Sequence, residues 1–200
     1  MARVRLKVEE RRGDLLRAAV EQIELRGASE LRLSDVAAAL GVSNALVVYH
    51  FESKDKLVAA AFAYAAEADL DHLHRLLDRP VSAEQRVRAA VRWYSPTGQA
   101  KGWRLWIEGW AVSLREPTLR EVSASVDRQW RAALVDVLTE GVGSGEFTCP
   151  DPSASADRLT AFIDGLAVRM TVHPGTVSRR ATDAWVEAAL VRELGLIPEL

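Results

Sequence analysis

Aromatic residues with helical spacing are the first feature of this sequence that could bind a ligand. Trp103, Trp106 and Trp110 are three and four residues apart, so one face of an α-helix would carry all three. Pockets lined by aromatic groups with a few polar ones are the usual form of small-molecule sites. The spacing predicts an effector pocket, with a tightly filled helical core as the alternative. The candidate lining residues are Trp93, Tyr94, Trp103, Trp106, Trp110, Trp130 and Phe162.

The chemistry of such a pocket depends on the charges beside it. Tryptophan faces attract quaternary ammonium groups when an acidic residue balances the charge. Glu108 and Asp164 are close in sequence to the aromatic residues and could supply that charge. A cage for a cation is therefore one form that the pocket could take.

Residues that could support catalysis or hold a metal are poorly arranged. His72 and His74 are two residues apart and would point to different sides of a helix. The glycine-rich run at 141–145 lacks the third glycine of a dinucleotide fingerprint and follows a helix instead of a strand. Ser144 and Cys149 have no base nearby in the sequence, although a distant base stays an alternative. We expect no enzyme activity, no metal and no cofactor.

The elements that must position these residues are helices. Apolar residues recur at helical spacing almost everywhere, and no strand-like alternation of useful length occurs. No apolar run approaches the roughly 18 residues of a membrane span, and a single cysteine favours a cytoplasmic location. The fold class is predicted to be all-α, with about nine helices at 9–26, 33–40, 43–50, 53–77, 82–95, 99–115, 117–141, 152–172 and 178–194.

Two short helices around Gly41 have the pattern of a helix-turn-helix. Val47 and Phe51, four residues apart, would anchor the second of them to the first long helix. The opposite face then presents Ala45 and Tyr49, with Leu46 and Val48 beside them. An exposed surface this apolar suits thymine methyls, sugars and the floor of a DNA groove.

Polar and basic residues lie where a duplex backbone would run. Ser43 can cap the second short helix, whose free N–H groups can then face a phosphate. His50, Lys54 and Lys56 follow the same helix. Residues 1–12 carry a net charge of +3 although the whole chain carries −2, which fits a nucleic-acid contact by a basic arm or, equally, a solvated tail.

The run from about Arg12 to Leu57 resembles the TetR family of bacterial regulators. The shared motifs are a Gly-Val-Ser turn, the cluster Tyr49-His50-Phe51 and the run Ser53-Lys54-Asp55-Lys56-Leu57. They cover the first quarter of the chain. The stretch from Trp103 to Leu119 is similar to the C-terminal domain of the betaine-inhibitor-like branch.

The resemblance implies roles for individual positions. Asn44 and Ala45 correspond to positions that touch base edges, and Tyr49 corresponds to a contact with the groove wall. Phosphate-contacting positions correspond to Ser34, Ser43, His50 and Lys54. Two usual polar contacts are missing, because Leu46 and Val48 replace a small hydroxyl residue and a tyrosine. Arg32 also replaces the threonine that often caps the second helix, which leaves Ser34 as the alternative cap or contact. Arg32, which we include with Leu46 among the candidate contacts, or the basic arm could compensate.

The last two predicted helices carry apolar faces wider than one core requires, which indicates a four-helix interface between two subunits. Burial within one chain is the alternative. The candidate interface residues are Leu159, Ile163, Leu166, Met170, Trp185, Val186, Ala189 and Leu190.

The sequence thus predicts a homodimer, with a DNA-binding domain at 1–52 and an effector-binding and dimerisation domain at 53–200. Its expected partners are a palindromic operator in double-stranded DNA and a small-molecule effector, with repression as the family default and no membrane partner. The alternatives are a ligand-binding helical protein without DNA binding and a helical enzyme.

Overall fold

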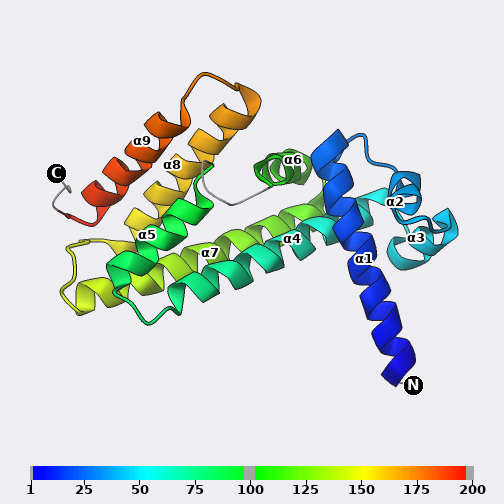
Figure 1. Cartoon of the computed structure of the whole chain (residues 1–200), viewed down its shortest axis with the longest axis horizontal. Helices are drawn as coiled ribbons and strands as arrows, with labels where there is room; N and C mark the ends of the chain where they lie inside the picture. The colour runs from blue at the N-terminus through cyan, green and yellow to red at the C-terminus, as the bar shows by residue number, and fades with distance from the viewer. Residues whose placement is uncertain (1, 97–101, 197–200) are drawn as a thin grey trace. The chain divides into compact units, whose positions relative to one another are not determined.

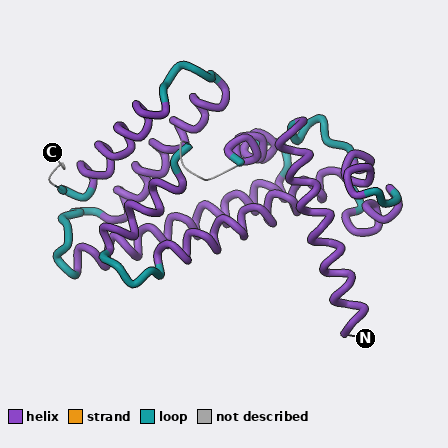
Figure 2. Tube along the Cα trace, in the orientation of Figure 1, coloured by secondary structure: helices purple, strands orange, loops and turns teal. Residues whose placement is uncertain are grey.

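The computed structural model describes residues 2–96 and 102–196, with side chains from Val8 onward. Within these ranges all regular structure is helical, as predicted (Figures 1 and 2). Thr97, Gly98 and the first three residues of the predicted sixth helix lie outside the described residues, as do the side chains of Arg3, Arg5 and Lys7. The helices are α1 (Ala2–Arg26), α2 (Leu33–Leu40), α3 (Asn44–Phe51), α4 (Lys54–Leu77), α5 (Ala83–Tyr94), α6 (Trp103–Ser113), α7 (Pro117–Gly143), α8 (Pro152–Val172) and α9 (Arg179–Glu193).

Several helices begin where a side chain accepts a hydrogen bond from a free backbone N–H. The Ser43 hydroxyl accepts from Leu46 N at 3.3 Å, and the Asp151 carboxylate accepts from Ala154 N at 3.0 Å. Such caps satisfy donors that have no partner within the helix. At the end of α2, Gly41 adopts φ 64°, a conformation that allows the sharp turn into α3.

The chain divides into two compact units. The first unit comprises Met1–Ala68 and Arg104–Val126, and the second comprises Asp69–Trp103 and Asp127–Leu200. The division therefore falls within α4, α6 and α7, whereas the sequence suggested a single boundary after residue 52. The difference arises because the first half of α4 is part of the core that holds α2 and α3.

The core of the first unit joins the helix-turn-helix to its supporting helices. Val36 of α2 and Val47 of α3 are fully buried, and Leu15 of α1 and Leu57 of α4 lie in the same cluster. Leu105 of α6 also belongs to it. In Figure 1, α2 and α3 lie side by side next to α1. Burial of these residues fixes the orientation of α3, which determines which of its side chains remain exposed.

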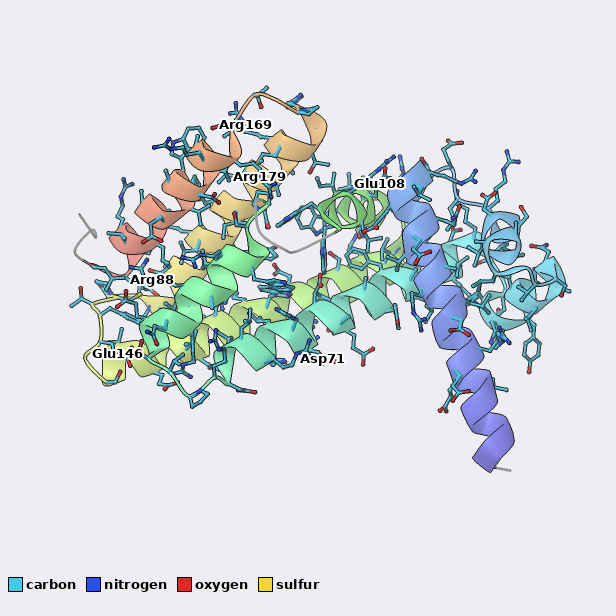
Figure 3. The ribbon with its side chains drawn as sticks, viewed as in Figure 1. Asp71, Arg88, Glu108, Glu146, Arg169 and Arg179 are labelled. Atoms are coloured by element: carbon cyan, nitrogen blue, oxygen red, sulfur yellow. The ribbon has the colours of Figure 1, made fainter. Side chains whose placement is uncertain are left out.

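In the second unit, α9 packs against α8 and α5. Arg88 of α5, labelled in Figure 3, forms ion pairs with Glu84 and with Glu187 of α9. Five residues of the predicted subunit interface are buried within this chain itself, so they offer little surface to a second copy. They are Leu159, Ile163, Leu166, Val186 and Leu190.

No helix within the described residues is both long enough and apolar enough to cross a membrane.

Candidate nucleic-acid interface and effector site

The outward face of α3 carries the side chains that the sequence assigned to DNA contact. Val47 and Phe51 anchor the helix in the core, with exposed fractions of 0% and 3%. Asn44, Ala45 and Tyr49 are exposed, and Tyr49 retains 76% of its accessible surface. Val48 is also exposed and Leu46 is half-buried. The face therefore combines one amide, one phenol and apolar surface, which could contact base edges and thymine methyls.

The start of α2 differs from the alternative that the sequence suggested. Arg32, not Ser34, occupies the N-cap position, and its backbone N–H donates to the Asp35 carboxylate at 2.9 Å. Ser34 is exposed within the first turn. The Asp35 carboxylate therefore holds the start of α2 from within the first turn of the helix.

Arg12 holds the C-terminal end of α3, a role that the sequence did not reveal. Its Nη1 donates to the His50 carbonyl oxygen at 3.0 Å, and its Cζ lies 4.6 Å from the centroid of the Phe51 ring. A guanidinium at this position interacts favourably with the negative end of the helix dipole and with the aromatic face. The contact joins residues 38 positions apart, so local sequence patterns could not show it.

The same surroundings affect His50. Burial lowers the pKa of the His50 imidazole below its usual 6.5, and the charges of Arg12 and Arg11 lower it further. The imidazole is therefore mainly neutral at neutral pH, so any hydrogen bond that it makes to a phosphate would come from an uncharged ring.

Both lysines after α3 have partners within the protein. The Lys54 ammonium donates to the Ser29 carbonyl oxygen, tying the start of α4 to the loop before α2. The Lys56 ammonium pairs with the Glu52 carboxylate at 2.5 Å. An ammonium group has three N–H donors, so these contacts leave each lysine able to approach a phosphate as well.

Four aromatic residues of the second unit, Trp93, Tyr94, Trp103 and Trp130, form what we call the aromatic cluster. The Tyr94 ring centroid lies 4.4 Å from that of Trp130 and 4.9 Å from that of Trp103. Trp93 and Trp130 stack with an interplanar angle of 3°. The His72 ring stacks on Trp93 at 4.5 Å. The four rings of the aromatic cluster come from α5, α6 and α7, and the His72 ring comes from α4.

Carboxylates give the aromatic cluster a negative environment. The Tyr94 hydroxyl donates to Asp164 Oδ1 at 2.7 Å. Burial raises the pKa of Asp164 to about 6; the Tyr94 hydrogen bond opposes this shift and the Asp127 charge adds to it. Burial also raises the pKa of Tyr94 well above 10, and the charges of Asp164, Asp127 and Asp69 reinforce the effect. Asp164, Asp127 and Asp69 thus place negative charge beside the Tyr94 hydroxyl.

The remaining candidate effector residues lie elsewhere. In the first unit, Trp106 packs edge-on against Phe62 with 4.8 Å between the ring centroids. The ring centroid of Trp110 lies 6.5 Å from that of Trp106. Phe162 is 37% exposed. Trp103 contacts different partners from Trp106 although both lie on one helical face, because Trp103 is the first residue of α6 and belongs to the second unit.

Two polar residues have different roles from those that the sequence indicated. His72, considered only as a poor metal ligand, stacks on Trp93 of the aromatic cluster, a contact between α4 and α5 that local sequence patterns could not show. Glu108, considered as a charge for the pocket, instead accepts a hydrogen bond from Ala28 N at 3.2 Å. No group of His, Cys, Asp and Glu within the described ranges could hold a metal ion.

Two family models match the chain. The model for bacterial regulatory proteins of the tetR family matches residues 15–61, and the model for the C-terminal domain of BetI-type transcriptional repressors matches residues 83–195. The second match alone covers more than half of the chain. The two matches fall on the helix-turn-helix and on the part that carries the aromatic cluster.

Individual relatives agree with the family models. The HTH-type transcriptional regulator BetI of Pseudomonas aeruginosa is 26% identical over 171 residues, covering 80% of this chain and 80% of that protein. The regulator of the same name from Stenotrophomonas maltophilia is 26% identical over 189 residues, covering 90% and 93%. These relatives regulate transcription and are not enzymes, which decides against the helical-enzyme alternative.

Solved structures show the same fold. A putative transcriptional regulator from Saccharomonospora viridis, crystallised in complex with choline, is 25% identical with a TM-score of 0.83, over 92% of this chain and 96% of that one. A TetR transcription regulator from Haloarcula marismortui has a TM-score of 0.82 at 20% identity, over 94% and 97%. The chain therefore belongs to the tetR family of bacterial regulatory proteins with a BetI-type C-terminal domain, and it is a DNA-binding transcriptional regulator.

Proposed function

We propose that this chain is a homodimeric repressor that leaves a palindromic operator when a small quaternary ammonium compound binds in its aromatic cluster. The observation that carries the proposal is the packing of three tryptophans and one tyrosine beside Asp164. A related regulator of the same fold was crystallised with choline, which is such a compound. The relatives named BetI support repression as the mode of action.

The physical argument rests on the electrostatics of the aromatic cluster. A quaternary ammonium group has no N–H donors, so it gains little from hydrogen-bonding partners and is held by the negative faces of aromatic rings. Desolvation strengthens this attraction within a buried site. The carboxylate of Asp164 then balances the charge, while its hydrogen bond to Tyr94 holds it in place.

The DNA contacts follow from the exposed face of α3. We assign base contacts to Asn44, Ala45 and Tyr49, with Leu46 against the sugar or groove wall. The remaining candidates, Arg32, Ser34, Ser43, His50 and Lys54, would contact phosphates. Exposure of Tyr49 and the buried anchors beneath it support this arrangement, because a groove-binding helix must present its side chains on a rigid base.

A second copy of the chain is proposed to pair through α8 and α9. Trp185 of α9 is 48% exposed, and Phe162, Val168 and Val172 of α8 are also exposed. Met170 and Ala189, both predicted for the interface, are half-buried. Exposed apolar side chains on two helices that pack together are typical of a four-helix interface, and a palindromic site requires a two-fold partner.

The effector is tested by comparing choline with 3,3-dimethylbutan-1-ol, which has the same shape but no charge. Isothermal titration calorimetry on the purified protein should show choline binding at least about tenfold more tightly, because the cation–π and carboxylate contacts act only on the charged ligand. Choline should also weaken binding to an operator selected from random duplexes. Equal affinity for the two ligands, or operator binding that ignores choline, would contradict the proposal.

A further inference from the structure

Glu108 of α6 joins that helix to the end of α1 within the first unit (Figure 3 labels Glu108). Its carboxylate accepts the hydrogen bond from Ala28 N and lies against Gly27, which has φ +92°. A Cβ at residue 27 would lie 2.8 Å from Glu108 Oε1. The absence of a side chain at Gly27 therefore lets the carboxylate reach the backbone just beyond α1.

Arg104, one turn before Glu108, makes a second contact with the same end of α1. Its Nη1 donates to the Leu25 carbonyl oxygen at 3.4 Å, and its Nε lies 4.0 Å from Glu108 Oε1. Carbonyl groups in the last turn of a helix lack partners within the helix, and so does the N–H that follows it. The two side chains of α6 thus supply one donor and one acceptor to the backbone around the end of α1.

The same helix is firmly seated on α4. Gly109 faces the Phe62 ring so closely that an added Cβ would lie 2.2 Å from its Cε2 atom. One turn earlier, Trp106 packs edge-on against the same ring. Because these contacts fit without free space, a shift of α6 must also move what it touches.

The first residue of α6 is part of the aromatic cluster. Trp103 contacts Tyr94 in the second unit, and the next residue in the chain, Arg104, belongs to the first unit. A ligand that rearranges Trp103 therefore acts on the same continuous helix that carries Arg104 and Glu108.

We propose that Glu108 is a positioning residue: it transmits the movement of α6 that follows effector binding to the helix-turn-helix. The proposal rests on the proposed function. Movement of Trp103 on effector binding displaces α6, and the Glu108 carboxylate transfers that displacement to the segment between α1 and α2. Since α2 packs against α1 and α3, the orientation of the DNA-contacting face changes with it.

The test measures operator affinity with and without saturating choline by fluorescence anisotropy, on full-length protein. The ratio of the two dissociation constants is the coupling factor, which is typically about 5- to 150-fold. Glu108→Ala should lower this factor toward one, by up to about tenfold, because a hydrogen bond to a charged group is lost. The affinity of the free protein for choline should stay unchanged.

Two variants separate coupling from a loss of structure. Glu108→Gln retains an oxygen that can accept from Ala28 N and should keep most of the coupling, whereas Glu121→Ala removes an exposed carboxylate from α7 of the same unit and should keep all of it. If Glu108→Ala does not fold, Arg104→Ala should lower the coupling factor in the same direction.

Linkage supplies a second measurement, because the operator must change choline affinity by the same factor in each variant. A coupling factor that Glu108→Ala preserves, or one that Glu121→Ala lowers equally, overturns the role of Glu108 and leaves the proposed function intact. A wild-type coupling factor of one contradicts the proposed function and the role of Glu108 together.

Discussion

Individual side chains determine how rigidly the DNA-contacting face is presented. Tyr49 projects into solvent, and the residues that hold its helix are buried beneath it. Arg12 also holds this helix, although its own side chain is exposed. Its guanidinium donates a hydrogen bond to the His50 carbonyl oxygen and lies over the Phe51 ring at the end of α3. An exposed arginine in this position can also approach a phosphate. Arg12 could therefore act by positioning α3 or by contacting the DNA backbone directly.

Replacing Arg12 with Ala should weaken operator binding by about tenfold, because the end of α3 loses both a charge-assisted hydrogen bond and a cation–π contact. Arg12→Lys should restore only part of the loss, since an ammonium lacks the planar guanidinium. Binding is measured by anisotropy over a range of salt concentrations. An unchanged salt slope indicates positioning, whereas a slope smaller by about one indicates a lost phosphate contact.

Arg17→Ala is the matched control for Arg12. Arg17 is exposed on the same helix and pairs with Asp14 at 3.6 Å. Its removal lowers the positive charge by the same amount. If both variants weaken operator binding equally, the effect of Arg12 is general electrostatics and the contact with α3 is unimportant.

At the level of elements, α6 requires close approach to α4, and one glycine allows it. Gly109 leaves room for the Phe62 ring, which is only 1% exposed and contacts Trp106 as well. Any side chain at residue 109 would have to displace a buried ring or move α6. The glycine is thus part of the packing that couples the two helices.

Gly109→Ala should lower the free energy of unfolding by about 1–3 kcal/mol, the usual cost of overpacking a filled core. Gly13→Ala in α1 is the control, because nothing lies within 4 Å of the position that its Cβ would take. That substitution should raise stability by about 0.5–1 kcal/mol through helix propensity. Urea denaturation of both variants checks the expectation, and a Gly109→Ala protein as stable as wild type would show that α6 moves freely on α4.

On the scale of the whole molecule, protonation of Asp164 links stability to effector binding. Its pKa is raised from 3.8 to about 6 in the folded protein, chiefly by burial. The folded state therefore binds this proton more tightly than the unfolded state does. The resulting contribution to stability is fully present below about pH 4 and is lost as the pH rises through about 6.

Asp164→Asn should remove this pH dependence. Above pH 6 the variant should be more stable than wild type, by an amount of the order of a few kcal/mol, because no buried charge forms. Thermal or urea unfolding between pH 4 and pH 8 measures the difference.

The effector should respond in the opposite sense. A bound cation favours the charged carboxylate, so choline affinity should rise as the pH increases through about 6, and Asp164→Asn should bind choline weakly with a flatter profile. His72, Asp69 and Asp127 also lie in or beside the aromatic cluster, and the variant separates their titration from that of Asp164. A wild-type profile identical to that of Asp164→Asn would show that Asp164 does not contact the cation.

The sequence by itself determined the helical elements and the exposed face of α3. Residues three and four positions apart share a helical face, so Val47 and Phe51 could be assigned to the core and Ala45 and Tyr49 to the surface from spacing alone. Caps such as Ser43 are equally local, because donor and acceptor are three residues apart. The motifs at the start of the chain then indicated the family.

Only the tertiary structure decided which partners the aromatic residues of α6 contact. Trp103 and Trp106 are indistinguishable by spacing, yet one joins Tyr94 and the other joins Phe62, because the partners come from helices distant in the sequence. The contacts of Arg12 with His50 and of Glu108 with Ala28 span 38 and 80 residues. A periodic pattern reports which face of a helix is apolar, but it does not record which other helix covers that face.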